Sequence, residues 1–179
     1  MKKTNRRIDT KILVFGALLC SISIVIGLIC KNYFNFMNGF ARVTFENFPI
    51  IIAGIWFGPL VGAIVGVISD LATAVLSPPY QPNLLISIAP ATIGILSGLL
   101  SRYIIKGRKF SHILIITFTV HIVGSILIKT PILVMMGYPV YVWYIRIGIY
   151  ILVASIESYL IYVIVNNRAI TSGVERLRK

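Results

Sequence analysis

The chain has 179 residues, of which 58% are hydrophobic and only 12% are charged, and its formal net charge is +12. Soluble domains are about 45–50% apolar and about 25% charged. This composition therefore argues against a soluble enzyme, a disordered protein and a disulfide-stapled secreted domain. At about 20 residues per membrane-spanning helix, six spans would use about 120 residues. We expect an integral membrane protein.

Six apolar stretches follow one another along the chain. The first has a basic front like that of a signal peptide. However, it is longer than the usual apolar region of about 7–15 residues, and no Ala-x-Ala-like cleavage site follows it. Residues that break helices, such as Gly58-Pro59 and Gly137-Tyr138-Pro139, mark the turns. The predicted spans are residues 12–30, 45–57, 60–76, 84–103, 111–136 and 140–165. This pattern predicts an all-α bundle of six transmembrane helices in a single membrane domain, residues 1–179.

The distribution of positive charge predicts the orientation of the chain. Thirteen of the 17 Lys and Arg residues fall in the N-terminal segment, in residues 102–109 and in the C-terminal tail. Cytoplasmic segments of membrane proteins carry such an excess. We therefore expect both termini to be cytoplasmic, in a multi-pass protein of the plasma membrane. The charge is explained by this orientation in the bilayer, and no nucleic acid partner is expected.

Several ionisable residues remain near the predicted outer ends of the spans: Arg42, Glu46, Asp70, Lys129 and Arg146. A charge at the centre of a membrane helix costs at least about 2.5–3.5 kcal/mol. One interpretation is that the cations extend to the outer interface and pair with the acids. The other is an outward-facing polar pocket. Intramembrane ionisable residues favour the pocket.

Aromatic and amide side chains share this outer face. Aromatic residues there form the interfacial belt of any membrane protein, but a few could stack on a ligand. Together with the ionisable residues, they give the predicted substrate-binding set: Arg42, Phe45, Glu46, Asn47, Asp70, Tyr80, Gln81, Asn83, Lys129, Tyr138, Trp143 and Arg146.

The residues that resemble enzyme motifs do not form complete motifs. The Lys129-Thr130 pair resembles the end of a phosphate loop, but Ile128 stands where that loop needs glycine. His121 lies alone in its span, where a packed, hydrogen-bonded role is the better interpretation. Glu157 is either a proton relay or an interhelical hydrogen-bonding group, and the second is favoured. No metal site, no cofactor and no enzymatic activity are expected.

Small residues recur at four-residue spacing on three spans, which lets helix backbones approach closely. On residues 60–76 and 84–103 we interpret them as packing within the bundle. On the first span the choice between internal packing and docking of another membrane subunit stays open. The predicted docking residues are Gly16, Ala17, Cys20 and Ser21.

Two motifs carry a resemblance to a known family. They are Arg42-Val-Thr-Phe-Glu-Asn-Phe-Pro49 and Phe57-Gly-Pro-Leu-Val-Gly, which continues to Asp70-Leu71. They resemble the membrane-embedded substrate-binding (S) components of energy-coupling-factor vitamin transporters, and most of all the folate-specific ones. The resemblance covers nearly the whole chain. It implies a six-helix S component that binds a vitamin at its outer face.

The same resemblance implies partners. An S component docks, largely through its first helix, onto a transmembrane coupling subunit that is carried by two cytoplasmic ATPases. The family's Ala-x-x-x-Ala docking motif has its nearest match in Ala17-x-x-x-Ser21. High-affinity folate binding, followed by ATP-driven delivery through these partners, is the function that the resemblance implies.

Folate suits the chemistry of the predicted pocket. Its pterin offers an amino group and a neighbouring ring N–H, which one carboxylate can accept together. Asp70 is the first choice for this role and Glu46 the second. The two carboxylates of the glutamate tail call for cations such as Arg146, Lys129 or Arg42.

Other functions remain open at the level of the sequence. The chain could be an S component for another vitamin such as thiamine, riboflavin or pantothenate, although cationic thiamine suits the outer cations badly. It could be a stand-alone proton-coupled carrier that uses Asp70, His121 and Glu157, but no clear inverted repeat supports this. A third possibility is a structural membrane subunit that binds no ligand. The buried cations at the outer face disfavour it.

Overall fold

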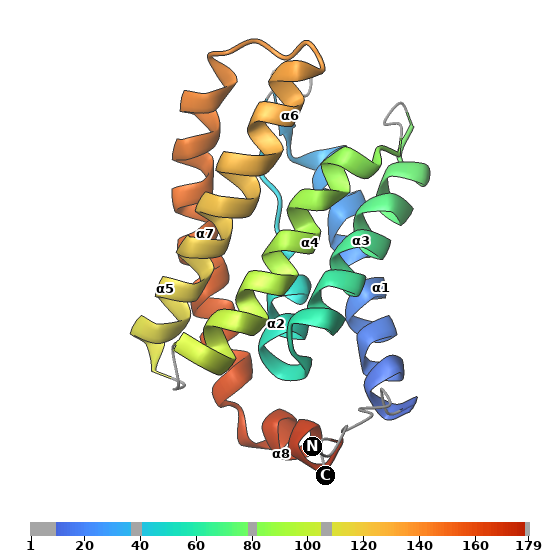
Figure 1. Ribbon diagram of the computed structural model, residues 1–179, viewed down its shortest axis with the longest axis vertical. Coiled ribbons are helices and arrows are strands. Elements are labelled where there is room, and N and C mark those ends of the chain that lie inside the picture. The colour runs from blue at the N-terminus through green and yellow to red at the C-terminus, as the bar shows by residue number, and fades with distance from the viewer. Residues whose placement is uncertain (1–9, 37–40, 79–81, 105–108, 178–179) are drawn as a thin grey trace, which may run out of the picture.

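The computed structural model describes residues 10–36, 41–78, 82–104 and 109–177, and this part of the chain is almost entirely helical (Figure 1). The helices are α1 (Thr10–Tyr33), α2 (Asn47–Phe57), α3 (Pro59–Val75), α4 (Leu84–Leu99), α5 (Phe110–Val120), α6 (Thr130–Met135), α7 (Val142–Asn166) and α8 (Arg168–Leu177). Two π-helical stretches, Leu100–Ile104 and His121–Lys129, extend α4 and join α5 to α6. Strands β1 (Asn35–Phe36) and β2 (Ala41–Arg42) form a two-residue antiparallel ribbon.

The predicted helical class is confirmed. Four continuous helical stretches are long and apolar enough to cross a membrane: Thr10–Tyr33, Leu84–Tyr103, Phe110–Met135 and Val142–Asn166. The other two predicted spans correspond to the shorter apolar helices α2 and α3. Large apolar side chains are exposed along α1 and α7, as a lipid-facing surface requires.

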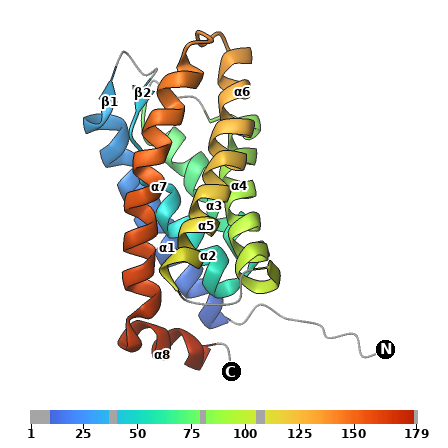
Figure 2. The ribbon, with the colours of Figure 1, turned by 90° about the vertical axis from the view of Figure 1, so that its left-hand side faces the viewer.

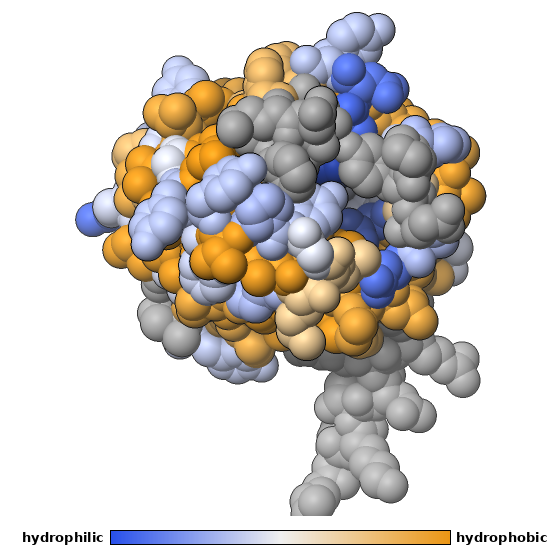
Figure 3. All heavy atoms as spheres, turned by 90° about the horizontal axis from the view of Figure 1, so that it is seen from above, coloured by the Kyte–Doolittle hydropathy of each residue, from blue (hydrophilic) through white to orange (hydrophobic). Residues whose placement is uncertain are grey.

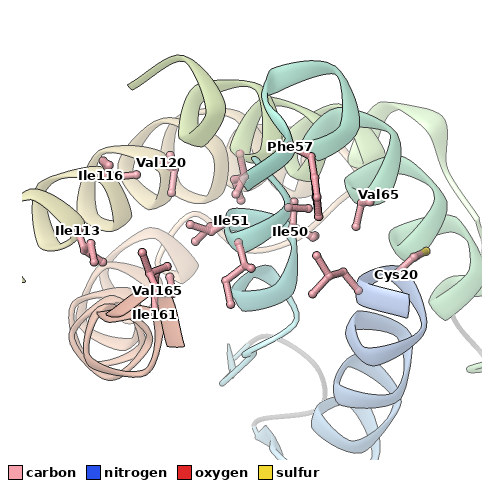
Figure 4. Close-up of a cluster of buried hydrophobic side chains, with 14 of the residues drawn as sticks. Cys20, Ile50, Ile51, Phe57, Val65, Ile113, Ile116, Val120, Ile161 and Val165 are labelled. Carbon is pink, nitrogen blue, oxygen red and sulfur yellow. The ribbon is translucent and has the colours of Figure 1, made fainter. Parts of the chain in front are cut away.

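Helix α2 is the centre of the apolar core. It packs against α1, α3, α4 and α7. Ile50, Ile51, Ile52 and Ala53 are all at most 2% exposed, and Figure 4 shows Ile50 and Ile51 surrounded by side chains of the neighbouring helices. With eleven residues, α2 is only about 16 Å long, which is about half the thickness of the hydrocarbon core.

A glycine seam joins α3 to α4. Gly62 and Gly66 of α3 face Gly94 and Pro90 of α4 so closely that a Cβ on any of the three glycines would overlap the opposite backbone. The turn before α3 also requires glycine, because Gly58 has a φ of +98°. The prediction of internal packing by the small residues of these two helices is therefore confirmed.

The fifth predicted span is not a uniform α-helix. Pro131 has no N–H to donate, and its ring would clash with the carbonyl one turn earlier. The preceding stretch, His121–Lys129, is π-helical, and the Thr130 hydroxyl donates a 2.9 Å hydrogen bond to the Ser125 carbonyl. Such wider turns are frequent at functional sites. Here the stretch places His121, Ser125 and Lys129 in the protein interior.

The C-terminal helix α8 was not predicted, since the sequence analysis treated these residues as a basic tail. In Figure 2, α8 lies across the end of the bundle opposite to the β1–β2 ribbon. Val174 is 4% exposed and joins the apolar core. The Thr171 hydroxyl donates to the Val165 carbonyl at the end of α7. The sequence signal for α8 was that its apolar residues fall on one face of an otherwise polar segment, which is typical of a surface helix.

The glycine seam gives a direct test of the packing. Gly94→Ala should lower the melting temperature of the purified protein in detergent, because overpacking a tight interface costs about 1–3 kcal/mol. Gly148→Ala is the matched control, since a Cβ on Gly148 of α7 meets nothing within 4 Å. It should leave the melting temperature unchanged or raise it slightly. Equal melting temperatures for the two variants would contradict the close α3–α4 contact.

Candidate functional site

A cavity of about 270 Å³ opens at the end of the bundle opposite to α8, where α1, α3 and α6 end and α7 begins. Figure 3 looks onto this end and shows hydrophilic residues gathered in a hollow, while hydrophobic residues cover much of the periphery. The described residues that line the cavity are Lys31, Arg42, Thr44, Asp70, Ala74, Asn83, Ile86, Lys129, Leu133, Met136, Tyr138, Arg146 and Tyr150.

An ion cluster forms the floor of this cavity. The Lys129 ammonium lies 3.4 Å from Glu46 Oε1 and 3.8 Å from Asp70 Oδ1, so it is shared by two carboxylates. The Arg42 guanidinium approaches the same Glu46 oxygen at 3.3 Å. All four side chains are at least four-fifths buried. Pairing is what makes charges tolerable at such a depth.

Glu46 reaches the cluster because the chain between β2 and α2 is not helical and continues from the ribbon to the start of α2. The Ser23 hydroxyl on α1 donates a 2.6 Å hydrogen bond to the Glu46 carbonyl. Non-helical backbone at membrane depth occurs only where protein or a cavity surrounds it, as here. The carboxylate also stands at the N-terminus of α2, where the helix dipole favours negative charge.

Asp70 is held from the opposite side. Ser87, in the first turn of α4, donates a 2.8 Å hydrogen bond to Asp70 Oδ2. Its helix begins with Asn83, whose side chain accepts from the Leu85 N–H and so caps α4. The cap therefore places both Ser87 and the cavity-lining Asn83.

The α7 wall of the cavity is formed by Arg146 and Tyr150, one helical turn apart. Arg146 Nη2 donates a 2.9 Å hydrogen bond to the Tyr150 hydroxyl, and the guanidinium lies 5.3 Å from the centre of that ring. Arg146 Nε is buried and has no hydrogen-bond partner within the described part of the chain. Buried donors of this kind are nearly always satisfied, by protein, water or a ligand.

The charges around the cavity do not balance. Among the described residues, the cations Lys31, Arg42, Lys129 and Arg146 line it, whereas the acidic side chains are Asp70 in its wall and Glu46 beneath it. Two positive charges are left in excess. Across the described ranges, no three His, Cys, Asp or Glu side chains come together as a metal site would need. The arrangement suits a small anionic ligand that also carries hydrogen-bond donors for Asp70.

A family model for the substrate-specific component of ECF transporters matches residues 11–172. The chain belongs to this family. Its fold is similar to a solved structure described as "Crystal structure of FolT bound with folic acid", with a TM-score of 0.66 and 18% sequence identity. The similarity covers 85% of this chain and 93% of that one. No curated protein sequence gives a significant match.

Six of the residues predicted to form the substrate site of this S component line the cavity: Arg42, Asp70, Asn83, Lys129, Tyr138 and Arg146. Glu46 lies directly beneath and bonds to two of them. Tyr80 and Gln81 lie outside the described residues. Asn47 is buried at the start of α2, and Phe45 and Trp143 are half-buried outside the cavity wall.

The sequence analysis missed several cavity residues. Lys31 lies just beyond the first predicted span, residues 12–30, but α1 continues to Tyr33 and carries Lys31 into the wall. Tyr150 was missed as well, although its position four residues after Arg146 on one helix was an available signal. Thr44, Ala74, Ile86, Leu133 and Met136 are the other additions. Nothing in their residue types distinguishes them from packing residues.

The small residues of α1 divide between two roles. Gly16 and Cys20 are buried and Ala17 and Ser21 exposed, yet all four line one apolar groove between α1 and α3. The groove has a volume of about 380 Å³. Its α3 side is made by Val61, Ile64, Val65 and Ile68. The first span therefore combines internal packing with an open apolar surface.

Lys129 should be the most sensitive position of the ion cluster. Lys129→Met leaves Glu46 and Asp70 without their shared cation, and removing one partner of a buried pair costs about 3–5 kcal/mol. We expect a large fall in melting temperature in detergent. The double variant Lys129→Met with Asp70→Asn should recover part of it, because one unpaired charge is removed.

The control for this experiment is Lys109→Met, since Lys109 is an exposed residue just before α5. It should melt like the wild type. A Lys129→Met variant as stable as this control would show that the cluster does not stabilise the fold.

Proposed function

We propose that this S component binds folate in the cavity and that the cavity faces the outside of the cell. The supporting observation is that the described residues leave an excess of two positive charges around a site that also contains a carboxylate, and offer no hydrogen-bond partner to the buried Arg146 Nε–H. Folate carries two carboxylates at one end and a pterin donor pair at the other. The fold similarity to FolT with folic acid supports the same ligand.

Asp70 is the proposed partner of the pterin. Its Oδ2 accepts from Ser87 and its Oδ1 lies 3.8 Å from Lys129. Each carboxylate oxygen has about two acceptor positions, so both can still receive the pterin amino group and ring N–H. Glu46 is the weaker candidate, because one of its oxygens already meets two cations and it lies beneath the cavity wall.

Arg146 is the proposed partner of the glutamate tail. Among the three cations considered from the sequence, Lys129 and Arg42 are engaged by the protein's own carboxylates. Arg146 instead donates to the neutral Tyr150 hydroxyl and keeps Nε for a ligand. Lys31, in the same wall, adds a second positive charge near the tail.

This assignment predicts different losses for two ligands. Arg146→Ala should weaken folate binding about tenfold or more, since a hydrogen bond to a charged group is worth about 1.5–3 kcal/mol. Pteroic acid lacks the glutamate and should be affected little. Asp70→Asn should weaken both ligands alike. Calorimetry with both ligands on both folded variants measures this.

Equal losses of folate and pteroic acid binding in Arg146→Ala would contradict the assignment. Arg146 would then be a structural partner of Tyr150 alone.

The orientation and the membrane crossings belong to the same proposal. Cytoplasmic termini in the plasma membrane follow from the positive-inside distribution, and six crossings then place the cavity outside. Consistent with this, α8 and the start of α1 lie at the end opposite to the cavity. The short helices α2 and α3 would make the second and third crossings, helped by the non-helical segment before α2.

Delivery of the vitamin would need partners. We propose that the α1–α3 groove docks a transmembrane coupling subunit, which two cytoplasmic ATPases drive. An apolar groove lined by small residues suits an apolar helix of that subunit, because backbones can approach closely there.

The docking proposal is tested by placing a large side chain in the α1–α3 groove. Ala17→Trp or Ser21→Trp should reduce co-purification of the coupling subunit and folate uptake, while folate affinity stays unchanged. Leu18→Trp is the control, because Leu18 is exposed on α1 but does not line the groove. Loss of folate affinity with intact co-purification would instead assign the groove to internal packing.

Two alternatives keep a distinct test. If another vitamin displaced labelled folate from the purified protein, that vitamin would be favoured as the ligand. A stand-alone proton-coupled carrier would draw on the buried His121–Glu157 pair, whose Nε2–Oε2 distance is 2.6 Å. Vesicles that contain only this protein should bind folate without accumulating it. Accumulation driven by a proton gradient would favour the carrier.

A further inference from the structure

Tyr150 holds Arg146 in the α7 wall of the cavity by two separate contacts. Its hydroxyl accepts a 2.9 Å hydrogen bond from Arg146 Nη2, and its ring centre lies 5.3 Å from the guanidinium carbon. The hydrogen bond fixes the direction of the planar guanidinium, and the ring contact keeps that group close to α7. Tyr150 is 5% exposed and lines the cavity, but it has no part in the ligand contacts proposed above.

Tyr150 is itself held in place by a buried histidine. The ring centres of His121 and Tyr150 are 5.4 Å apart, and the two ring planes make an angle of 31°. His121 is only 1% exposed. Its Nε2 lies 2.6 Å from Glu157 Oε2, and its Nδ1 lies 3.3 Å from Ser125 Oγ. Because both ring nitrogens have partners, the imidazole cannot turn freely, and it forms a fixed surface against Tyr150.

This support matters because arginine is a flexible residue. Immobilising a long side chain costs rotamer entropy. When a neighbour already holds the side chain in the free protein, a ligand binds without that loss and therefore binds more tightly. Lys129 and Arg42 are held by carboxylates, whereas Arg146 is held by the neutral Tyr150 hydroxyl. Tyr150 therefore orients Arg146 without neutralising its charge.

We propose that Tyr150 is the positioning residue for Arg146 and that this contact makes the cavity select ligands with an anionic tail. The inference rests on the proposed folate site and deepens it, because it names the class of pterin ligand that the site prefers. A pterin with a glutamate tail gains from the oriented guanidinium, and a pterin without that tail does not. Discrimination between the two classes then depends on the Tyr150 hydroxyl.

Tyr150→Phe is the decisive variant, because it removes the hydroxyl and keeps the ring that contacts Arg146 and His121. Tyr162→Phe is the matched control. It makes the same change on the same helix, but the Tyr162 ring packs against Phe110 and does not line the cavity. Melting temperatures in detergent establish that both variants are folded.

Calorimetric titration with folate and with pteroic acid measures the selectivity. Tyr150→Phe should lower the folate affinity about fivefold, as expected for one hydrogen bond of typical strength. Its affinity for pteroic acid should stay unchanged, so the ratio of the two affinities falls by the same factor. Tyr162→Phe should leave both affinities unchanged. A purely structural role of the Tyr150 hydroxyl would lower both affinities together.

A double-mutant cycle separates positioning from direct contact, because Tyr150 lines the cavity and its hydroxyl could itself touch the ligand. If Tyr150 acts through Arg146, the two substitutions are not additive. Tyr150→Phe should then cause no further loss of folate affinity in protein that already carries Arg146→Ala. A direct contact between Tyr150 and folate would keep its full effect in that background. If Arg146→Ala does not fold, Arg146→Met takes its place in the cycle.

Each outcome bears on a separate claim. Equal losses of folate and pteroic acid binding in Tyr150→Phe overturn the positioning role and leave the folate site standing. A loss of folate affinity that persists in full beside Arg146→Ala does the same. Wild-type protein that binds no folate overturns the proposed function, and the inference with it.

Discussion

The interaction between Lys129 and its two carboxylates is the constraint on which the outer half of the molecule depends. Charges within an apolar bundle must be paired, and Lys129 joins three segments that are distant in the sequence. Glu46 belongs to the non-helical segment before α2, Asp70 to α3 and Lys129 to the π-helical stretch after α5. Their pairing fixes the relative depth of these segments and so determines where the cavity floor lies.

The apolar half of the bundle supplies the rigid base for this cluster. Helix α2 is short and mostly buried, and the glycine seam brings α3 and α4 into backbone contact. Asp70 and Ser87, which sit on these two helices, are therefore held at hydrogen-bonding distance. A short central helix also leaves room above it. That room is the cavity, and its positive excess suits the anionic vitamin that we propose as its ligand.

Much of this arrangement could be predicted because hydropathy and helix-breaking residues mark the membrane helices directly. Ionisable residues in apolar stretches are rare and costly, so Asp70, Lys129 and Arg146 could be selected before their contacts were known. The π-helical stretch and helix α8 were not predicted. They depend on tertiary packing: Pro131 can be accommodated by a kink or by a wider turn, and only the neighbouring helices decide which. Tyr150 was hidden because a tyrosine in an apolar helix is ordinarily a packing residue.

The central claim is that the cavity binds folate, and direct binding to the purified protein tests it. Labelled folate would be titrated onto the detergent-solubilised chain without partner subunits or nucleotide, with excess thiamine, riboflavin or pantothenate as competitors. The account predicts saturable binding of one folate per chain that none of the three competitors displaces. Absence of folate binding, or its displacement by one of these vitamins, would contradict it.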